Sequence, residues 1–120
     1  MKLKNRPQKV EEILLEWNIS AQNWAWPLHE LILKQGEISC DLRWSLPFYG
    51  YHKWQIYMNH LKTGGLKCCF MNAKSLPSAE STLFWRGRAR VAGLRFPEEC
   101  EDPYELLAPI EETFLLDRGF

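Results

Sequence analysis

Long apolar runs are absent from this chain of 120 residues, in which no 18 consecutive residues are apolar. A membrane-spanning helix needs roughly 17 to 25 such residues, so we expect none. The first ten residues include four basic side chains, but no apolar segment of signal-peptide length follows them. We therefore predict a cytoplasmic protein that does not contact a membrane.

A pairing pattern of cysteines is also absent. The four cysteines, at positions 40, 68, 69 and 100, have neither the CxxC spacing of a zinc site nor the density of a disulfide scaffold. Adjacent residues of a strand point to opposite faces, so Cys68 and Cys69 cannot easily chelate one metal ion together. Buried, reduced thiols are the favoured interpretation, and the alternative is a thiol enzyme with His52 or His60 as its base.

Signatures of catalysis and of cofactor binding are also missing. The chain has no nucleophile elbow, phosphate-binding glycine loop, dinucleotide fingerprint or zinc motif, and its three histidines form no HxH or HExxH pattern. A non-enzymatic protein is therefore favoured over an enzyme.

The composition nevertheless predicts a well-packed globular unit. Hydrophobic residues make up 46% of the chain and charged residues 25%, and sixteen residues are aromatic, six of them tryptophan. Each aromatic side chain buries about 150 to 250 Å² when it is internal. One domain spanning residues 1–120 can thus form a core that needs no disulfide or metal.

Charge is balanced in total but divided along the chain. Residues 1–95 carry fourteen Lys and Arg against seven Asp and Glu, whereas residues 96–120 carry one Arg against eight acids. A basic surface for an anionic partner is one interpretation. The favoured one is that the acidic tail packs near the basic strands, so that the two segments neutralise each other within one fold.

Hydrophobic periodicity predicts helices at both ends and strands between them. Pro7 begins the first helix, the second starts within a turn of Pro27 and stops at Gly36, and Asp102 caps a third. The strands are expected at about 38–44, 51–58, 66–71 and 88–96. The predicted fold is α+β, an antiparallel sheet of about four strands covered on one face by two N-terminal helices and a C-terminal helix. The expected core contains Trp17, Leu31, Trp54, Ile56, Phe70, Val91 and Leu106.

The segment Asp41–Tyr49 carries the most specific motif. Trp44 alternates in step with Cys40 and Leu42, and Pro47 is expected to end the strand, so the segment is interpreted as a structural corner. The alternative is that Tyr49 and Tyr51 line a pocket for a small anion or a peptide, together with Arg86, Arg88 and Arg90.

This motif resembles the signature of the YdhG-like family, also called domain of unknown function 1801. In that signature an acid, an apolar residue, a basic residue and Trp are followed by two variable residues, Pro, an aromatic residue and Tyr. Phe70, Leu76 and the run Gly93–Pro97 also fall where that family has comparable elements. The resemblance spans residues 37–116. Asn72-Ala73, where a glycine-containing turn is usual, and Trp54 depart from the pattern. The resemblance implies a small cytosolic α+β fold with an antiparallel sheet, which is often compared with that of frataxin. Some members of the YdhG-like family have been proposed as intracellular iron chaperones, but the resemblance names no ligand residue.

Acidic residues are densest at Glu98, Glu99, Glu101 and Asp102. Hard cations such as iron or magnesium prefer clustered carboxylate oxygens, so these four are the candidate ligands of a weak divalent metal site. The favoured interpretation is structural, because Asp102 with Glu105 would cap the last helix.

Arg86, Arg88 and Arg90 share one parity and would form a stripe on one face of a regular strand. Guanidinium groups suit phosphate or carboxylate, but pairing with the tail acids is favoured. The neutral net charge and the lack of an RNP-like motif argue against nucleic acid.

The sequence thus leads us to expect a non-enzymatic binding protein of the YdhG-like kind, with iron handling as its specific role. A protein or a weakly bound divalent metal is the expected partner, and iron is the candidate cofactor. The alternatives are an anion, peptide or nucleic-acid binding module on a basic sheet face, and a thiol enzyme.

Overall fold

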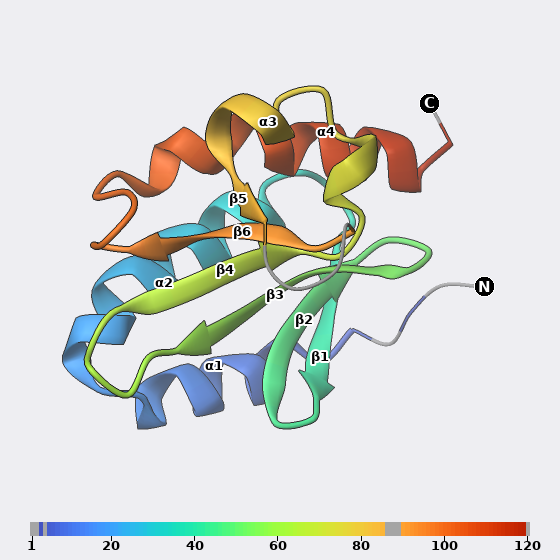
Figure 1. Ribbon diagram of the computed structural model, residues 1–120. Coiled ribbons are helices and arrows are strands. Elements are labelled where there is room, and N and C mark those ends of the chain that lie inside the picture. Colours follow the sequence, from blue (N-terminus) through green and yellow to red (C-terminus); the bar gives the residue numbers. More distant parts are fainter. Residues whose placement is uncertain (1–2, 4, 86–89, 120) are drawn as a thin grey trace.

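A computed structural model describes residues 3, 5–85 and 90–119 (Figure 1). Within these residues there are four α-helices and two short 3-10 helices: α1 (Pro7–Glu16), α2 (Ile19–Leu33), η1 (Ala73–Ser75), α3 (Ala79–Thr82), η2 (Pro103–Leu106) and α4 (Leu107–Asp117). The strands are β1 (Ser39–Arg43), β2 (Leu46–Gly50), β3 (Trp54–His60), β4 (Leu66–Phe70), β5 (Phe84–Trp85) and β6 (Ala92–Phe96).

The strands form one antiparallel sheet in the order β1-β2-β3-β4-β6-β5. The predicted α+β fold is therefore confirmed, with β2 and the two-residue β5 as strands that the sequence pattern did not reveal. Within the described residues, no helix is both long and apolar enough to cross a membrane.

Helix α2 begins earlier than predicted. The Asn18 side chain accepts a hydrogen bond from Ala21 N at 2.8 Å and caps the helix, which then continues through Pro27. The expectation that Pro27 lies near the start of this helix was wrong, because Asn18 supplies the start signal and the helix accommodates Pro27 in its interior despite the lost hydrogen bond.

Strand β2 replaces the predicted corner. Trp44 and Ser45 form a two-residue turn with φ angles of 52° and 62°, and the chain then returns along β1 with Pro47 opposite Leu42. The expectation that Pro47 ends a strand was wrong. The register between β2 and β3 begins only at Phe48, so the missing N–H of Pro47 falls outside that ladder.

A β-bulge separates two residues that the sequence pattern had placed on one face. Tyr49 lies opposite Ile56, whereas Gly50 lies opposite Trp54, so Gln55 is the extra residue. Ile56 is fully buried in the core, but half-buried Trp54 packs against Phe48 on the other face. The prediction of Trp54 as a core residue was therefore wrong.

The core lies between the helices and one face of the sheet (Figure 1). Helix α1 packs on β1 and β2, α2 packs on β4, and α4 adds Ile110 and Phe114. Of the predicted core, Val91 is half-buried and lies outside this cluster, since β6 begins only at Ala92. The other predicted core residues are buried in it: Trp17, Leu31, Phe70 and Leu106, together with Ile56.

Candidate functional site

The sheet face opposite the helices carries a group of four aromatic side chains, Trp44, Phe48, Trp54 and Tyr57, which we call the aromatic cluster. Phe48 is its centre, with ring centroids 5.6 Å from Trp44, 6.4 Å from Trp54 and 5.2 Å from Tyr57. Phe48 is only 4% exposed. The accessible aromatic surface therefore belongs to its three neighbours.

Trp44 stands out within this cluster because its side chain is 77% exposed at the tip of the β1–β2 turn. Its φ of 52° lies in the left-handed region, which costs a residue with a Cβ roughly 1 to 2 kcal/mol. The guanidinium carbon of Arg43 lies 5.0 Å from the Trp44 ring and 5.9 Å from the Trp54 ring. The turn thus presents a large indole to solvent with a cation over it.

Further cations continue this face across the sheet. The register aligns Asn59 with Lys67, and Lys67 with Arg95, on the side that carries Tyr57. Lys67 Nζ lies 6.0 Å from the Tyr57 ring centroid, and Arg95 Nε is buried without a hydrogen-bond partner among the described residues. Asp41 is the only carboxylate on the described strands, and it pairs with Arg6 at 3.8 Å. The face is therefore aromatic on one side and basic on the other.

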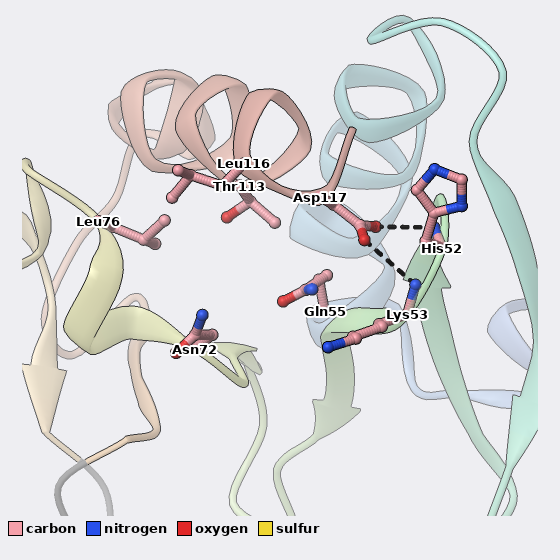
Figure 2. Close-up of a pocket in the computed structure, with 8 residues that line it drawn as sticks. All are labelled: His52, Lys53, Gln55, Asn72, Leu76, Thr113, Leu116 and Asp117. Carbon is pink, nitrogen blue, oxygen red and sulfur yellow. Dashed lines mark hydrogen bonds between the residues drawn. The ribbon is translucent and has the colours of Figure 1, made fainter. Parts of the chain in front are cut away.

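A separate polar cavity of about 320 Å³ lies between the end of α4 and the start of β3 (Figure 2). Asp117, the last residue of α4, binds the β2–β3 turn at its edge. The Asp117 carboxylate accepts hydrogen bonds from the backbone N–H groups of Tyr51 (2.6 Å), His52 (3.1 Å) and Lys53 (3.2 Å). This contact, between residues far apart in the sequence, was not predicted, because a lone Asp near a helix end gives no sequence signal for it.

The residues proposed from the sequence as an anion site are not brought together by the described part of the structure. Tyr49 is buried on the helix side of the sheet, and Tyr51 lies in the β2–β3 turn beside Arg118. Arg90 is exposed in a turn before β6, and its carbonyl accepts a hydrogen bond from Ala73 N. The other two members of the predicted stripe, Arg86 and Arg88, lie outside the described residues.

The acids proposed as metal ligands are partly engaged by the backbone. Glu99 accepts a hydrogen bond from Arg95 N at 2.9 Å, and Asp102 caps η2 through Tyr104 N at 2.9 Å. Glu98 and Glu101 are exposed. No group of three or more His, Cys, Asp or Glu that could hold a metal ion occurs in the described part of the chain. The helix cap that the sequence favoured is observed at Asp102. Metal binding by these four acids stays a prediction.

Neutralisation of the basic segment by the tail also stays a prediction, because Arg86 and Arg88 lie outside the described residues. Two described contacts attach the tail to groups that are not basic side chains: Glu112 accepts from Ser78 N at 3.1 Å and from the Ser78 hydroxyl at 2.7 Å, and Asp117 accepts from backbone N–H groups of the β2–β3 turn.

The four cysteines are buried and form no disulfide within the described part of the chain, as the sequence favoured. Burial raises the pKa of Cys40 to about 12, that of Cys100 to about 11, and that of Cys68 well above its usual value. A nucleophilic thiol needs a lowered pKa, so these three environments do not suit a thiol enzyme.

A buried histidine and tyrosine join α2 to β2. His29 Nδ1 and the Tyr49 hydroxyl are 2.8 Å apart, and both side chains are buried. Burial lowers the pKa of His29 and raises that of Tyr49. The neutral imidazole can therefore accept a hydrogen bond from the phenol.

This pair predicts a loss of stability in mild acid. At a pH above the ordinary histidine pKa of 6.5, His29 is neutral in both the folded and unfolded states. Below it, the unfolded state takes up a proton that the folded state resists, so the melting temperature should fall as the pH drops from about 7.5 to about 5.5. His29→Gln should flatten this profile, because glutamine cannot take up the proton. An equally steep profile for His29→Gln would show that another group is responsible.

No family model, no curated protein and no solved structure matches the chain. A proposal about its function therefore rests on the fold and on the contacts described above.

Proposed function

We propose that this protein is a non-enzymatic binding module that takes single-stranded nucleic acid on the sheet face that carries the aromatic cluster. The observation that carries the proposal is Trp44, a 77% exposed indole in a left-handed turn with Arg43 over its ring. Backbone strain of this kind persists where the surrounding structure enforces it, and it is concentrated at functional sites.

The arrangement of the face fits the two chemical parts of a nucleotide. Bases stack on aromatic side chains, and Trp44, Trp54 and Tyr57 supply ring surface at one side of the sheet. Phosphates need cations, and Lys67 and Arg95 lie on the adjacent strands β4 and β6. The neutral net charge of the chain argued against this ligand, but the charge that a ligand meets is that of this face.

The other functions expected from the sequence have less support. Iron handling requires clustered ligands, and the described residues provide no group of three. A thiol enzyme requires an accessible thiolate, and the four cysteines are buried.

We expect Trp44→Ala to weaken binding of a fluorescein-labelled oligo(dT) or oligo(U) by about fivefold or more, since stacking contributes about 1 to 3 kcal/mol per base. A Lys67→Ala/Arg95→Ala double variant should weaken binding and also reduce its salt dependence, because fewer counterions are released. Fluorescence anisotropy at two salt concentrations measures both effects.

Tyr104→Ala and Lys62→Ala are the matched controls, because these side chains are exposed and lie outside the strands, in η2 and in the β3–β4 loop. Both should bind like the unaltered protein. Binding that is absent at low salt, or that is lost equally in the controls, would contradict the proposal.

A further inference from the structure

The polar cavity beside Asp117 contains several side chains without a partner among the described residues. It lies at the opposite end of β2 from Trp44, and its walls come from α4, β3 and the corner after β4 (Figure 2). The side chains of Lys53, Gln55 and Asn72 line it, and none of them makes a hydrogen bond within the described part of the chain. Gln55 is also half-buried. An amide in that position gains a partner only from water or from a ligand.

Two opposite charges line this cavity. Lys53 supplies an ammonium group, and Asp117 supplies a carboxylate. A carboxylate has about four lone-pair sites, and the three backbone N–H groups of the turn use two on Oδ2 and one on Oδ1. Oδ1 can therefore accept one further hydrogen bond. The Thr113 hydroxyl donates to Pro109 O at 2.7 Å, so it too is left as an acceptor.

Phosphate is a poor match for these groups. The backbone N–H groups that could bind a phosphate at the turn are used by Asp117, whose own charge repels a dianion. Among the described residues, no Phe, Tyr or Trp side chain lines the cavity, so a base or a sugar ring has no large aromatic surface on which to stack. A ligand with one positive and one negative group matches the two charges.

The remaining wall is apolar. Leu76 is buried and Leu116 is 44% exposed, and both point into the cavity from the side of α4 and η1 (Figure 2). The volume of about 320 Å³ lies at the lower end of the range for small-molecule sites, roughly 300 to 1,000 Å³.

From these contacts we infer that the cavity binds a free amino acid with an aliphatic side chain. Its carboxylate meets Lys53 and the amide N–H groups of Gln55 and Asn72. Its ammonium group donates to Asp117 Oδ1 and to the Thr113 hydroxyl, and its side chain packs on Leu76 and Leu116. This site is independent of the nucleic-acid face.

L-leucine tests the inference, with two analogues that each lack one charged group. 3-Methylbutylamine lacks the carboxylate, and 4-methylpentanoate lacks the ammonium group. In ¹H–¹⁵N correlation spectra of the full chain, L-leucine should shift the backbone amides of residues 51–55 and 72 saturably. Each analogue should bind at least about tenfold more weakly, because it loses a charge-assisted hydrogen bond.

Lys53→Met removes the ammonium group but keeps the backbone N–H that binds Asp117, so it should reduce the affinity for L-leucine at least about tenfold. Lys62→Met is the matched control, since Lys62 is exposed beyond the other end of β3. The inference is overturned if L-leucine produces no saturable shift, if either analogue binds as tightly, or if Lys53→Met binds like the control. None of these results depends on oligonucleotide binding.

Discussion

Gly50→Ala should destabilise the protein by about 3 kcal/mol or more, because there is no room for a methyl group at this position. A Cβ on Gly50 would lie 1.8 Å from the carbonyl oxygen of Lys53 and 2.7 Å from its carbon. Both are backbone atoms, so no side-chain rotation relieves the overlap. The β2–β3 turn would have to open, and with it the bulge that turns Trp54 away from the core.

Gly119→Ala is the matched control for this change. Gly119 has a φ of +91°, and no described atom lies within 4 Å of the point where an added Cβ would stand, so alanine there meets only backbone strain. We expect a loss of about 1 kcal/mol for it. Urea unfolding of both variants measures the difference, and a Gly50→Ala variant no less stable than Gly119→Ala would show that the turn is loose in solution.

The order and type of most elements could be predicted from the sequence because local signals specify them. The apolar periodicity that predicts helix α1 lies within that helix. The cap at Asp102 and the proline at position 103 directly precede or begin the helical segment that they start. The β1–β2 turn gave no such signal, since tight hairpin turns of this kind usually carry Asn-Gly or Asp-Gly rather than Trp-Ser.

The candidate sites were harder to predict because they depend on register. Trp44 lies in the β1–β2 turn, and Trp54 follows the irregular register between β2 and β3. The turn and the bulge each shift the in-and-out alternation of side chains, and only for that reason do the two indoles reach the same face of the sheet. Lys67 and Arg95 become neighbours through the pairing of β4 with β6, two strands separated in sequence by η1, α3 and β5. Sequence reasoning found basic residues on the predicted strands but could not determine which of them share a surface.

Asp117→Ala should also destabilise the fold markedly, by about 2 to 4 kcal/mol, although a simpler argument predicts the opposite sign. An acidic residue at the C-terminal end of a helix is unfavourable in the helix dipole by about 0.3 to 1 kcal/mol, so its removal alone would stabilise α4. Asp117 also binds three backbone N–H groups of the β2–β3 turn. Hydrogen bonds to a charged group contribute about 1.5 to 3 kcal/mol each when they are buried and less when they are exposed. Three of them outweigh the dipole.

Asp117→Asn separates the two effects, because it removes the charge but keeps one oxygen as an acceptor. We expect it to lose about half as much stability as Asp117→Ala, and we expect Glu111→Gln, at an exposed acid on the same helix, to change stability by less than about 0.5 kcal/mol. Hydrogen exchange should show that the amides of residues 51–53 lose protection in Asp117→Ala. If Asp117→Ala is instead more stable than the unaltered protein, the helix dipole dominates and Asp117 does not hold the turn.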